Sequence, residues 1–405
     1  MYEVNINYYL TYSSTLCKIV FMKRKLYQKI WDRIDTSEAI VVTGMRRVGK
    51  TVLLRQVYDD LASQNKLFLD LENPVNQKYF EEENYEAIRY QLEVLGVNST
   101  ARAYIFLDEI QFVKNVPSVV KYLMDHYPYK FFLTGSASFY LKNLFSESLA
   151  GRKILYELFP LDFAEFIELK GQNMTVPRGK INEALYQTVI PLYREYVEYG
   201  GFPGVVGKSS LDEKKEALKE IFTSYFNKEV LGIGAFRNNA VVRDLLLLLA
   251  ARVGNKIDVQ KLSAELGVSR VTINEYLAFL EGTYFITLVS PHSTNRDTEI
   301  RGAKKVYLCD TGLLNTLGNV EFGAVFENMI FHQFRNSGEV KYYQRKSLVE
   351  VDFVVNGKES WEVKTKASSQ DLKRVERLGG ELELKKNHVV SFEWVDLPVT
   401  YGFQI

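Results

Sequence analysis

The sequence predicts an α/β protein whose N-terminal half contains a parallel sheet. Three stretches point to this class, at residues 39–61, 102–111 and 130–138, because each has an apolar run followed by small, polar or acidic residues. Continuous apolar runs are typical of parallel strands that are covered on both faces. Sheets of this class bind their ligands at the carboxyl ends of the strands. The residues that follow each run are therefore the first candidates for a functional site.

The composition is that of a globular protein with more than one domain. The chain has 405 residues, a hydrophobic fraction of 46% and a charged fraction of 25%, which are ordinary values for a soluble protein of two or three domains. The 51 Lys and Arg residues nearly balance the 50 Asp and Glu residues. A nucleic-acid-binding surface would therefore have to be a local basic patch, because the chain as a whole is not basic. Cys17 and Cys309 lack metal-type spacing, and no long apolar run occurs. We expect a cytoplasmic protein without a disulfide scaffold or a membrane contact.

The first 21 residues differ from the rest. They hold polar residues throughout and lack a basic start, so a signal peptide is not expected. Met22 opens the amphipathic pattern MKRKLYQKIWDRI. We expect residues 1–21 to be a disordered extension, and translation starts at either Met1 or Met22.

The first stretch, AIVVTGMRRVGKTVLLRQVYDDL, predicts a phosphate-binding loop. It has the spacing Gly-x4-Gly-Lys-Thr between an apolar strand and an apolar-periodic helix, which is the context that this motif requires. Backbone N–H groups and the helix N-terminus attract phosphate oxygens, while the lysine reaches the β- and γ-phosphates of ATP and the threonine binds Mg²⁺. At least one of Arg46 and Arg47 is expected to face solvent. The expected nucleotide-binding set is Gly44, Arg47, Gly49, Lys50, Thr51 and Val52.

The second and third stretches supply the expected catalytic groups. Asp108 ends an apolar strand and is expected to hold Mg²⁺, partly through water, while Glu109 polarises the attacking water. An acid pair that merely caps the next helix is the alternative. After the third stretch, Thr134 or Ser136 is expected to sense the γ-phosphate, unless Ser136 only caps a helix. Arg152 is expected to stabilise transition-state charge on a neighbouring subunit's nucleotide, and a plain surface arginine is equally consistent with its spacing.

A helix-turn-helix is expected within residues 258–289. Leu262 and Leu266 lie one turn apart, GVS at 267–269 is a tight turn, and a second apolar face follows. The strand YFITLV would form a wing. The second apolar face is expected to consist of Val271, Ile273, Leu277 and Leu280.

Two interpretations of this helix-turn-helix remain open. In the first, the second helix contacts DNA through Arg270, Thr272 and Asn274. In the second it is structural or binds protein, because Glu275 and Glu281 are acidic and affinity for DNA comes mainly from Lys and Arg.

The C-terminal region predicts a helix followed by a hairpin. Phe326, Ile330 and Phe334 share one face of the helix and leave Glu327 on another. The hairpin turns at Asn356-Gly357. Its apolar residues gather on one face only if the loop has an odd number of residues.

That register places three polar residues of the hairpin on one face. Asp352 then lies opposite Glu362 and Glu350 opposite Lys364. Two opposed carboxylates repel each other, and a divalent cation would relieve that repulsion. The alternative is a solvated hairpin in which Lys364 only pairs with Glu350.

Several motifs together resemble a known family. The segments GMRRVGKT, FLDEIQ, LTGSAS, AGRK…ELFPLDFAEF and YGGFPGVV look like prokaryotic AAA+-type P-loop ATPases that carry an uncharacterised C-terminal domain. The resemblance covers residues 22–370. It implies an AAA+ core with a parallel sheet, a helical and winged-helix middle, and a C-terminal α/β domain similar to restriction endonucleases of the PD-(D/E)xK type.

The resemblance also assigns roles at the C-terminal site. Glu327, Asp352 and Glu362 would be metal ligands, and Lys364 would orient water or stabilise the transition state. We expect three domains after the extension, namely the ATPase domain at 22–205, the helical and winged-helix region at 206–295 and the endonuclease-like domain at 296–405.

Two functions are consistent with these features. The first is an ATPase that requires ATP and Mg²⁺ and acts on or with DNA. The second is a nucleotide-dependent switch that binds protein partners, in which the nuclease-like fold is inactive. A homo-oligomer is compatible with both, and stimulation of ATPase activity by DNA would separate them.

Overall fold

The computed structural model describes residues 22–136, 151–234, 236, 238–293, 295–335, 337–345 and 349–405. The expected disordered extension, residues 1–21, lies outside these ranges. The chain divides into two compact units. The first ends at Phe159 and also includes Gly282–Tyr284, while the second holds Pro160–Glu281 and Phe285–Ile405. No helix within the described ranges is long and apolar enough to cross a membrane.

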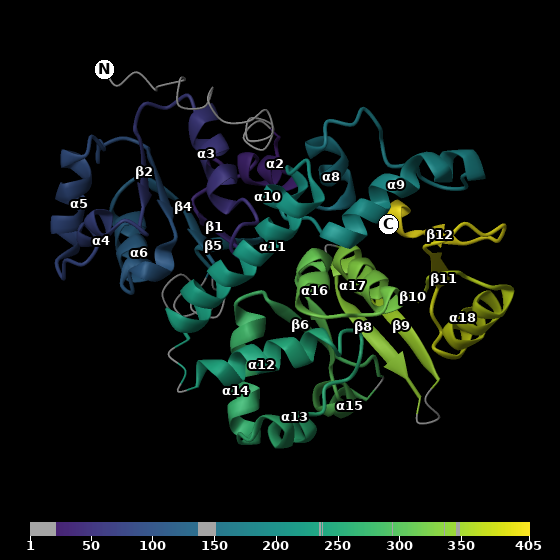
Figure 1. Ribbon diagram of the computed structural model, residues 1–405. Helices are drawn as coiled ribbons and strands as arrows, with labels where there is room; N and C mark the ends of the chain where they lie inside the picture. The colour runs from purple at the N-terminus through teal and green to yellow at the C-terminus, as the bar shows by residue number, and fades with distance from the viewer. Residues whose placement is uncertain are drawn as a thin grey trace. The chain divides into compact units, whose positions relative to one another are not determined.

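A five-stranded parallel sheet forms the centre of the first unit (Figure 1). Its strand order is β2-β3-β4-β1-β5, and all four neighbouring pairs are parallel. This confirms the predicted α/β class for the N-terminal half. Every residue of β1, β3 and β4 is buried, because helices cover both faces. The strands are β1 (Ala39–Thr43), β2 (Lys66–Asp70), β3 (Ala103–Asp108), β4 (Tyr129–Gly135) and β5 (Lys153–Glu157).

Alternate residues of β3 show how the two faces are covered. Ile105 and Leu107 join a core cluster with Ile88 of α5. Phe106 points the other way, where its ring stacks on Phe132 at 4.4 Å and meets Tyr58 of α3 at 5.3 Å. The helices of this unit are α2 (Lys25–Trp31), α3 (Lys50–Asp60), α4 (Pro74–Lys78), α5 (Tyr85–Val94), η2 (Ile110–Phe112) and α6 (Val116–His126).

The second unit is mainly helical up to Glu281. Its helix α9 packs against two helices that come more than 100 residues later, α16 and α17. For this reason the first unit ends at Phe159, earlier than the boundary expected at 205/206, and the expected middle and C-terminal domains lie in one unit. The finer division into three domains stays a prediction. The first helices are α8 (Phe163–Leu169), α9 (Glu183–Tyr199), α10 (Pro203–Val206), α11 (Leu211–Tyr225), η3 (Phe226–Leu231) and α12 (Asn239–Ala250).

Two helices and a turn occur where a helix-turn-helix is expected. Helix α13 (Val259–Leu266) ends at Gly267, whose φ of 65° is the left-handed conformation that glycine adopts readily. Helix α14 (Arg270–Gly282) begins after Ser269, whose hydroxyl accepts a hydrogen bond from the Thr272 N–H at 3.1 Å. Strand β6 (Ile286–Val289) then pairs antiparallel with β7 (Lys305–Leu308).

The prediction of the apolar face of α14 is wrong for one residue, Val271. Val271 is 67% exposed, whereas Ile273, Leu277 and Leu280 are buried as expected. Tyr276 is buried in addition, because the ring of Phe236 packs against it at 4.8 Å. At about 3.6 residues per turn, Val271 lies about 200° around the helix from Ile273, so the two cannot share a face and Val271 is left exposed.

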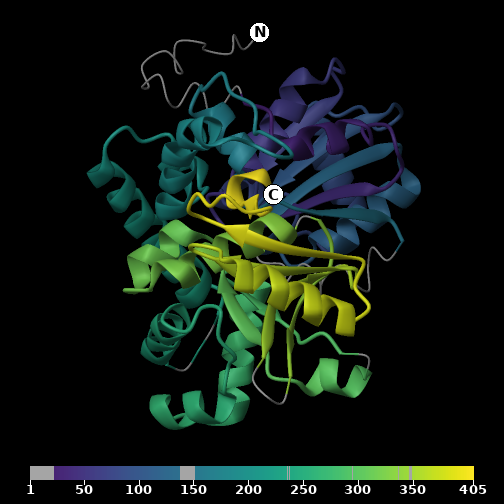
Figure 2. The same ribbon diagram turned by 90° about the vertical axis from the view of Figure 1, so that its right-hand side faces the viewer.

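The second unit also contains a five-stranded mixed sheet with the order β12-β11-β10-β9-β8. Strands β8, β9 and β10 are antiparallel neighbours, while β11 runs parallel to β10 and to β12. Figure 2 shows α18 in yellow lying across the strands. The elements are α15 (Arg296–Arg301), α16 (Thr311–Leu317), α17 (Phe322–Arg335), β8 (Val340–Gln344), β9 (Glu350–Val355), β10 (Glu359–Lys364), α18 (Ser369–Glu381), β11 (Lys386–Ser391), β12 (Thr400–Tyr401) and η4 (Gly402–Gln404).

The register of the β9–β10 hairpin confirms the prediction from apolar patterning. Val355 pairs with Glu359 and Phe353 pairs with Trp361, so the connecting loop has three residues and starts at the expected Asn356-Gly357 turn. The expected helix face also packs beneath this sheet. The ring of Phe334 lies 5.7 Å from Phe353 and 4.8 Å from Trp361. Asp352 is therefore in register with Glu362.

Candidate functional site

The loop between β1 and α3 has the shape that phosphate binding requires. Gly44 has φ 148°, and a Cβ atom there would lie 2.1 Å from the carbonyl oxygen of Leu158, so only glycine fits. Gly49 has φ 99° and precedes α3, and none of the described side chains caps that helix. Its first N–H groups and its positive dipole end thus face the loop.

Lys50 lies inside this loop. Its side chain is buried, and the ammonium group donates hydrogen bonds to the carbonyl oxygens of Gly44 (2.9 Å) and Met45 (3.0 Å). Lys50, Thr51 and Val52 form the first turn of α3. The ammonium group is thus held where a lysine would meet the phosphates of a nucleotide.

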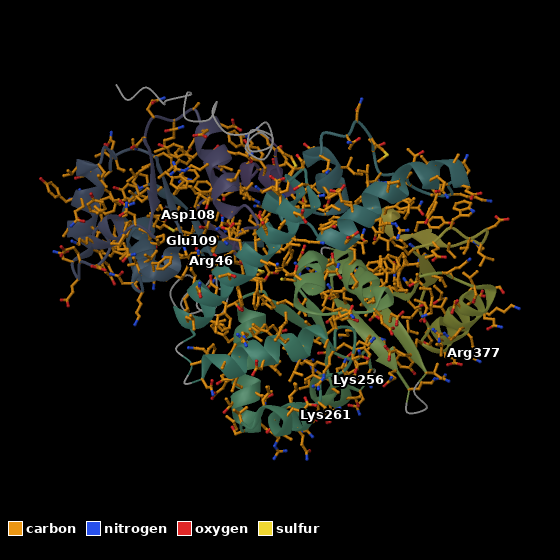
Figure 3. The ribbon with its side chains drawn as sticks, viewed as in Figure 1. Arg46, Asp108, Glu109, Lys256, Lys261 and Arg377 are labelled. Atoms are coloured by element: carbon orange, nitrogen blue, oxygen red, sulfur yellow. The ribbon has the colours of Figure 1, made fainter. Side chains whose placement is uncertain are left out.

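The two arginines of the loop differ in burial. Arg47, which we expected in the nucleotide-binding set, is exposed and has φ 67°. Arg46 is only 7% exposed, and Figure 3 labels it with Asp108 and Glu109 in the first unit. The expectation that at least one arginine faces solvent is met by Arg47, and Arg46 is the stronger candidate for a contact with phosphate.

Thr51 and Asp108 offer adjacent oxygens for a metal ion. The Thr51 hydroxyl donates to Asp108 Oδ2 at 2.7 Å. Burial raises the pKa of Asp108, and hydrogen bonds from Thr134 and Thr51 oppose that rise. Mg²⁺ prefers oxygen ligands and would stabilise the ionised form of this buried carboxyl. The donor set therefore fits Mg²⁺.

A chain of hydrogen bonds connects Asp108 to Glu109 through β4. The Thr134 hydroxyl donates to Asp108 Oδ1 and accepts from the Glu109 N–H at 3.0 Å. Glu109 has φ 54°, a left-handed conformation that is costly for a non-glycine residue and is concentrated at functional sites. Of the two sensor candidates, Thr134 thus contacts the acid pair directly.

Ser136 contacts the acid pair through Gln111, which the sequence reasoning missed. The Gln111 amide donates to Glu109 Oε2 and to the Ser136 hydroxyl at 3.0 Å. The available signal was its spacing, two residues after Glu109 in FLDEIQ. Gln111 therefore orients the carboxylate that is expected to activate water.

Two further residues support the loop and were not predicted. The Arg24 guanidinium donates to the carbonyl oxygens of Val48 (2.9 Å) and Phe159 (2.8 Å). The Tyr284 hydroxyl lies 2.5 Å from the Thr43 hydroxyl, directly before the loop. No sequence signal marks these residues, because both contacts join positions far apart in the chain.

Arg152 lies at the amino end of β1, whereas the phosphate-binding loop lies at its carboxyl end. The Arg152 carbonyl accepts a hydrogen bond from Ala39, the first residue of β1 (2.9 Å). Its side chain forms an ion pair with Asp125 of α6. Within one chain Arg152 is therefore far from the expected nucleotide site, and only a role on a neighbouring subunit stays a prediction.

Asp352, Glu362 and Lys364 lie together at the end of the β9–β10 hairpin. Asp352 Oδ2 accepts a hydrogen bond from the Val363 N–H at 2.8 Å. The ammonium of Lys364 lies 2.6 Å from Glu362 Oε1 and 4.0 Å from Asp352 Oδ2. The alternative pair of Lys364 with Glu350 is not formed.

Glu362 is almost completely buried. Arg374 of α18 also contacts its Oε1 atom, while its Oε2 atom is buried without a hydrogen-bond partner among the described residues. An unsatisfied buried carboxylate oxygen is costly. Such an oxygen is chemically suited to a divalent cation.

Glu327 is held by other groups. Its Oε1 atom accepts hydrogen bonds from the Tyr307 hydroxyl (2.7 Å) and from Lys305 (3.3 Å). Lys305, which is 2% exposed, also pairs with Glu350. Burial and the nearby Asp352 raise the pKa of Glu327 to about 7. Sequence reasoning missed Lys305, whose partners are set by tertiary packing.

The three expected ligands Glu327, Asp352 and Glu362 are not gathered into one metal site. Among the described residues, no group of three or more His, Cys, Asp or Glu side chains is placed to hold a metal ion. Two ligands, Asp352 and Glu362, share one register position of the hairpin. The third expected ligand, Glu327, instead accepts a hydrogen bond from Lys305.

Comparisons with known proteins find similarity to an AAA domain in the N-terminal part of the chain. Residues 36–167 match the family described as an AAA domain, and residues 190–323 match a domain of unknown function. An uncharacterized protein of Methanocaldococcus jannaschii is 28% identical over 78% of this chain and 72% of its own length. One of Haemophilus influenzae is 26% identical over 84% of each chain.

Two solved structures are similar in part. The Walker-type ATPase PABY2304 of Pyrococcus abyssi has 16% identity and a TM-score of 0.47 over 73% of this chain and 95% of its own. The ORC1 protein of Aeropyrum pernix, solved in complex with DNA, has 13% identity and a TM-score of 0.34 over 76% and 92%. At TM-scores below 0.5 neither assigns a function here. The AAA domain match and the parallel sheet support an AAA+-type ATPase core.

Proposed function

We propose that the protein binds ATP with Mg²⁺ and hydrolyses it. The observation that carries this proposal is the hydrogen-bond chain from Thr51 through Asp108 and Thr134 to Glu109. It joins the end of the phosphate-binding loop to the residue that would activate water.

The chain's own residues divide the work as follows. Lys50 and the N-terminus of α3 would hold the phosphates, and Thr51 with Asp108 would hold Mg²⁺, which neutralises charge as the terminal phosphate leaves. Glu109, oriented by Gln111 and by the backbone bond to Thr134, would accept hydrogen bonds from the attacking water.

We further propose that ATP hydrolysis responds to DNA through α14. Arg270 and Asn274 are exposed on this helix, and Arg270 has no ion-pair partner among the described residues. The alternative, a nucleotide-dependent switch that binds protein, is favoured by Val271, a large apolar side chain that is 67% exposed beside Arg270.

Double-stranded DNA is expected to raise the ATPase rate, and the rise should fall with salt because phosphate contacts release counterions. Arg270→Ala should reduce the stimulation and leave the rate without DNA unchanged. Arg243→Ala, which removes another exposed arginine on α12, is the matched control. An ATPase rate that is identical with and without DNA at low salt would favour the protein-binding switch, and Val271→Ser would then be the variant to test for lost partner binding.

We propose that Asp352 and Glu362 bind a divalent cation as part of a nuclease-like site. Mn²⁺ without nucleotide should raise the melting temperature of the full chain, because a metal at ten times its dissociation constant stabilises the folded state by about 1.4 kcal/mol. Asp108→Asn removes the contribution of the ATPase site, and the rise in melting temperature that remains should come from the hairpin. Asp352→Asn should remove this remaining rise, together with any nicking of DNA.

Glu359→Gln, on strand β10 with Glu362 but in a surface ion pair with Lys386, is the control and should change neither readout. If Asp352→Asn and wild-type protein respond equally to Mn²⁺, the hairpin holds no metal. The nuclease-like fold would then be a binding surface, as in the switch hypothesis.

A further inference from the structure

A pocket in the second unit lies outside both sites described so far. It has a volume of about 480 Å³, and its walls come from α9, α11, α16 and α17. Figure 1 shows α11 beside α16, although nearly 90 residues separate them in the chain. Pockets of about 300–1,000 Å³ are the size that proteins use for small molecules. The volume is therefore sufficient for a ligand.

The inner wall of the pocket is apolar. Val197, Leu218 and Val325 line it and are at most 3% exposed. Phe322 also lines the pocket and is 37% exposed. An aromatic ring so placed can stack on a flat ligand. This wall would bury the apolar body of a ligand.

Three basic side chains line the same pocket. Arg194 comes from α9, and Lys215 and Lys219 come from α11. None of them forms an ion pair with a residue that the structure describes. The guanidinium of Arg194 lies 5.1 Å from the centre of the Phe392 ring, a contact that positions it without neutralising it.

The acidic residues that the structure describes near the pocket do not pair with these three basic side chains. Lys214, adjacent to Lys215, pairs with Glu195 at 2.5 Å, and its ammonium lies 4.9 Å from the centre of the Tyr199 ring. Glu198 is the one carboxylate among the residues that line the pocket. The three basic groups therefore outnumber the acid in the pocket, and no described residue forms an ion pair with them.

We propose that this pocket binds a small aromatic phosphate monoester. The apolar wall and Phe322 would take the ring, while Arg194, Lys215 and Lys219 would take the phosphate. A phosphate monoester carries about −1.5 to −2 charges at pH 7, which matches the excess of basic groups better than a single carboxylate does. Arginine also meets phosphate with two parallel hydrogen bonds. The site is separate from the phosphate-binding loop and independent of its proposed function.

Phenyl phosphate is the probe, measured by calorimetry on full-length protein that carries Lys50→Ala, so that the phosphate-binding loop does not contribute. We expect a dissociation constant of about 1 mM or below, with weaker binding of phenol and of inorganic phosphate. Lys215→Ala combined with Lys219→Ala should weaken binding about tenfold or more, as expected when charge-assisted hydrogen bonds are lost. Lys208→Ala removes an exposed lysine just before α11 and should have no effect.

Phe322→Ala tests the apolar half of the site and should weaken phenyl phosphate but not inorganic phosphate. The double lysine variant changes exposed residues only, so its unfolding curve should match that of the parent protein. Equal affinity of the double variant and its parent would overturn the proposal. So would the absence of heat with phenyl phosphate, or inorganic phosphate that binds as tightly as phenyl phosphate.

Discussion

Lys50→Ala protein is expected to lose nucleotide binding, whereas Glu109→Gln protein is expected to bind ATP and fail to hydrolyse it. The Lys50 ammonium is buried inside the loop, and each charge-assisted hydrogen bond to phosphate is worth about 1.5–3 kcal/mol. The dissociation constant for ATP should therefore rise about 100-fold. Equilibrium binding of a fluorescent ATP analogue and phosphate release measure the two effects.

The Glu109→Gln substitution separates binding from chemistry. Mg²⁺ would be held by Thr51 and Asp108, which the change does not touch, while loss of the base should slow turnover by about 10²–10⁴-fold. Lys121→Ala and Glu83→Gln remove exposed groups of the same kinds elsewhere in the first unit and serve as controls. Hydrolysis by Glu109→Gln protein at the wild-type rate would show that another group activates the water.

Lys305→Met is expected to destabilise the second unit by about 3–5 kcal/mol, because it leaves buried carboxylates without their cation. Lys305 is 2% exposed and pairs with both Glu327 and Glu350, and Asp352 adds a third negative charge nearby. The free energy of unfolding from urea titrations, followed in the second unit, measures the loss.

Lys304→Met changes the preceding, more accessible lysine and should cost less than about 0.5 kcal/mol. Replacing Glu327 and Glu350 by Gln in the Lys305→Met protein should recover part of the stability, since the unpaired charges are then gone. A Lys305→Met protein as stable as wild type would mean that protonation or a bound cation, and not Lys305, neutralises these carboxylates.

Sequence patterns determined the parts of this protein that depend on local repeats. The continuous apolar runs of β1, β3 and β4, with glycines and acids after them, predicted the parallel sheet and the residues at its carboxyl edge. Apolar alternation in 349–363 likewise predicted the register that places Asp352 opposite Glu362. Each of these patterns is contained in one short segment of the sequence, and that same segment forms the strand or hairpin that the pattern predicts.

Tertiary structure alone decided which charges meet. Lys305 lies 22 residues from Glu327 and 45 from Glu350, yet its ammonium pairs with both carboxylates. In the same way, Arg152 lies at the amino end of the sheet beside Asp125, and the ring of Phe236 packs on Tyr276 of α14. Ion pairs and aromatic contacts of this kind join segments whose separation no periodicity encodes, because their geometry exists only after the helices and strands have packed.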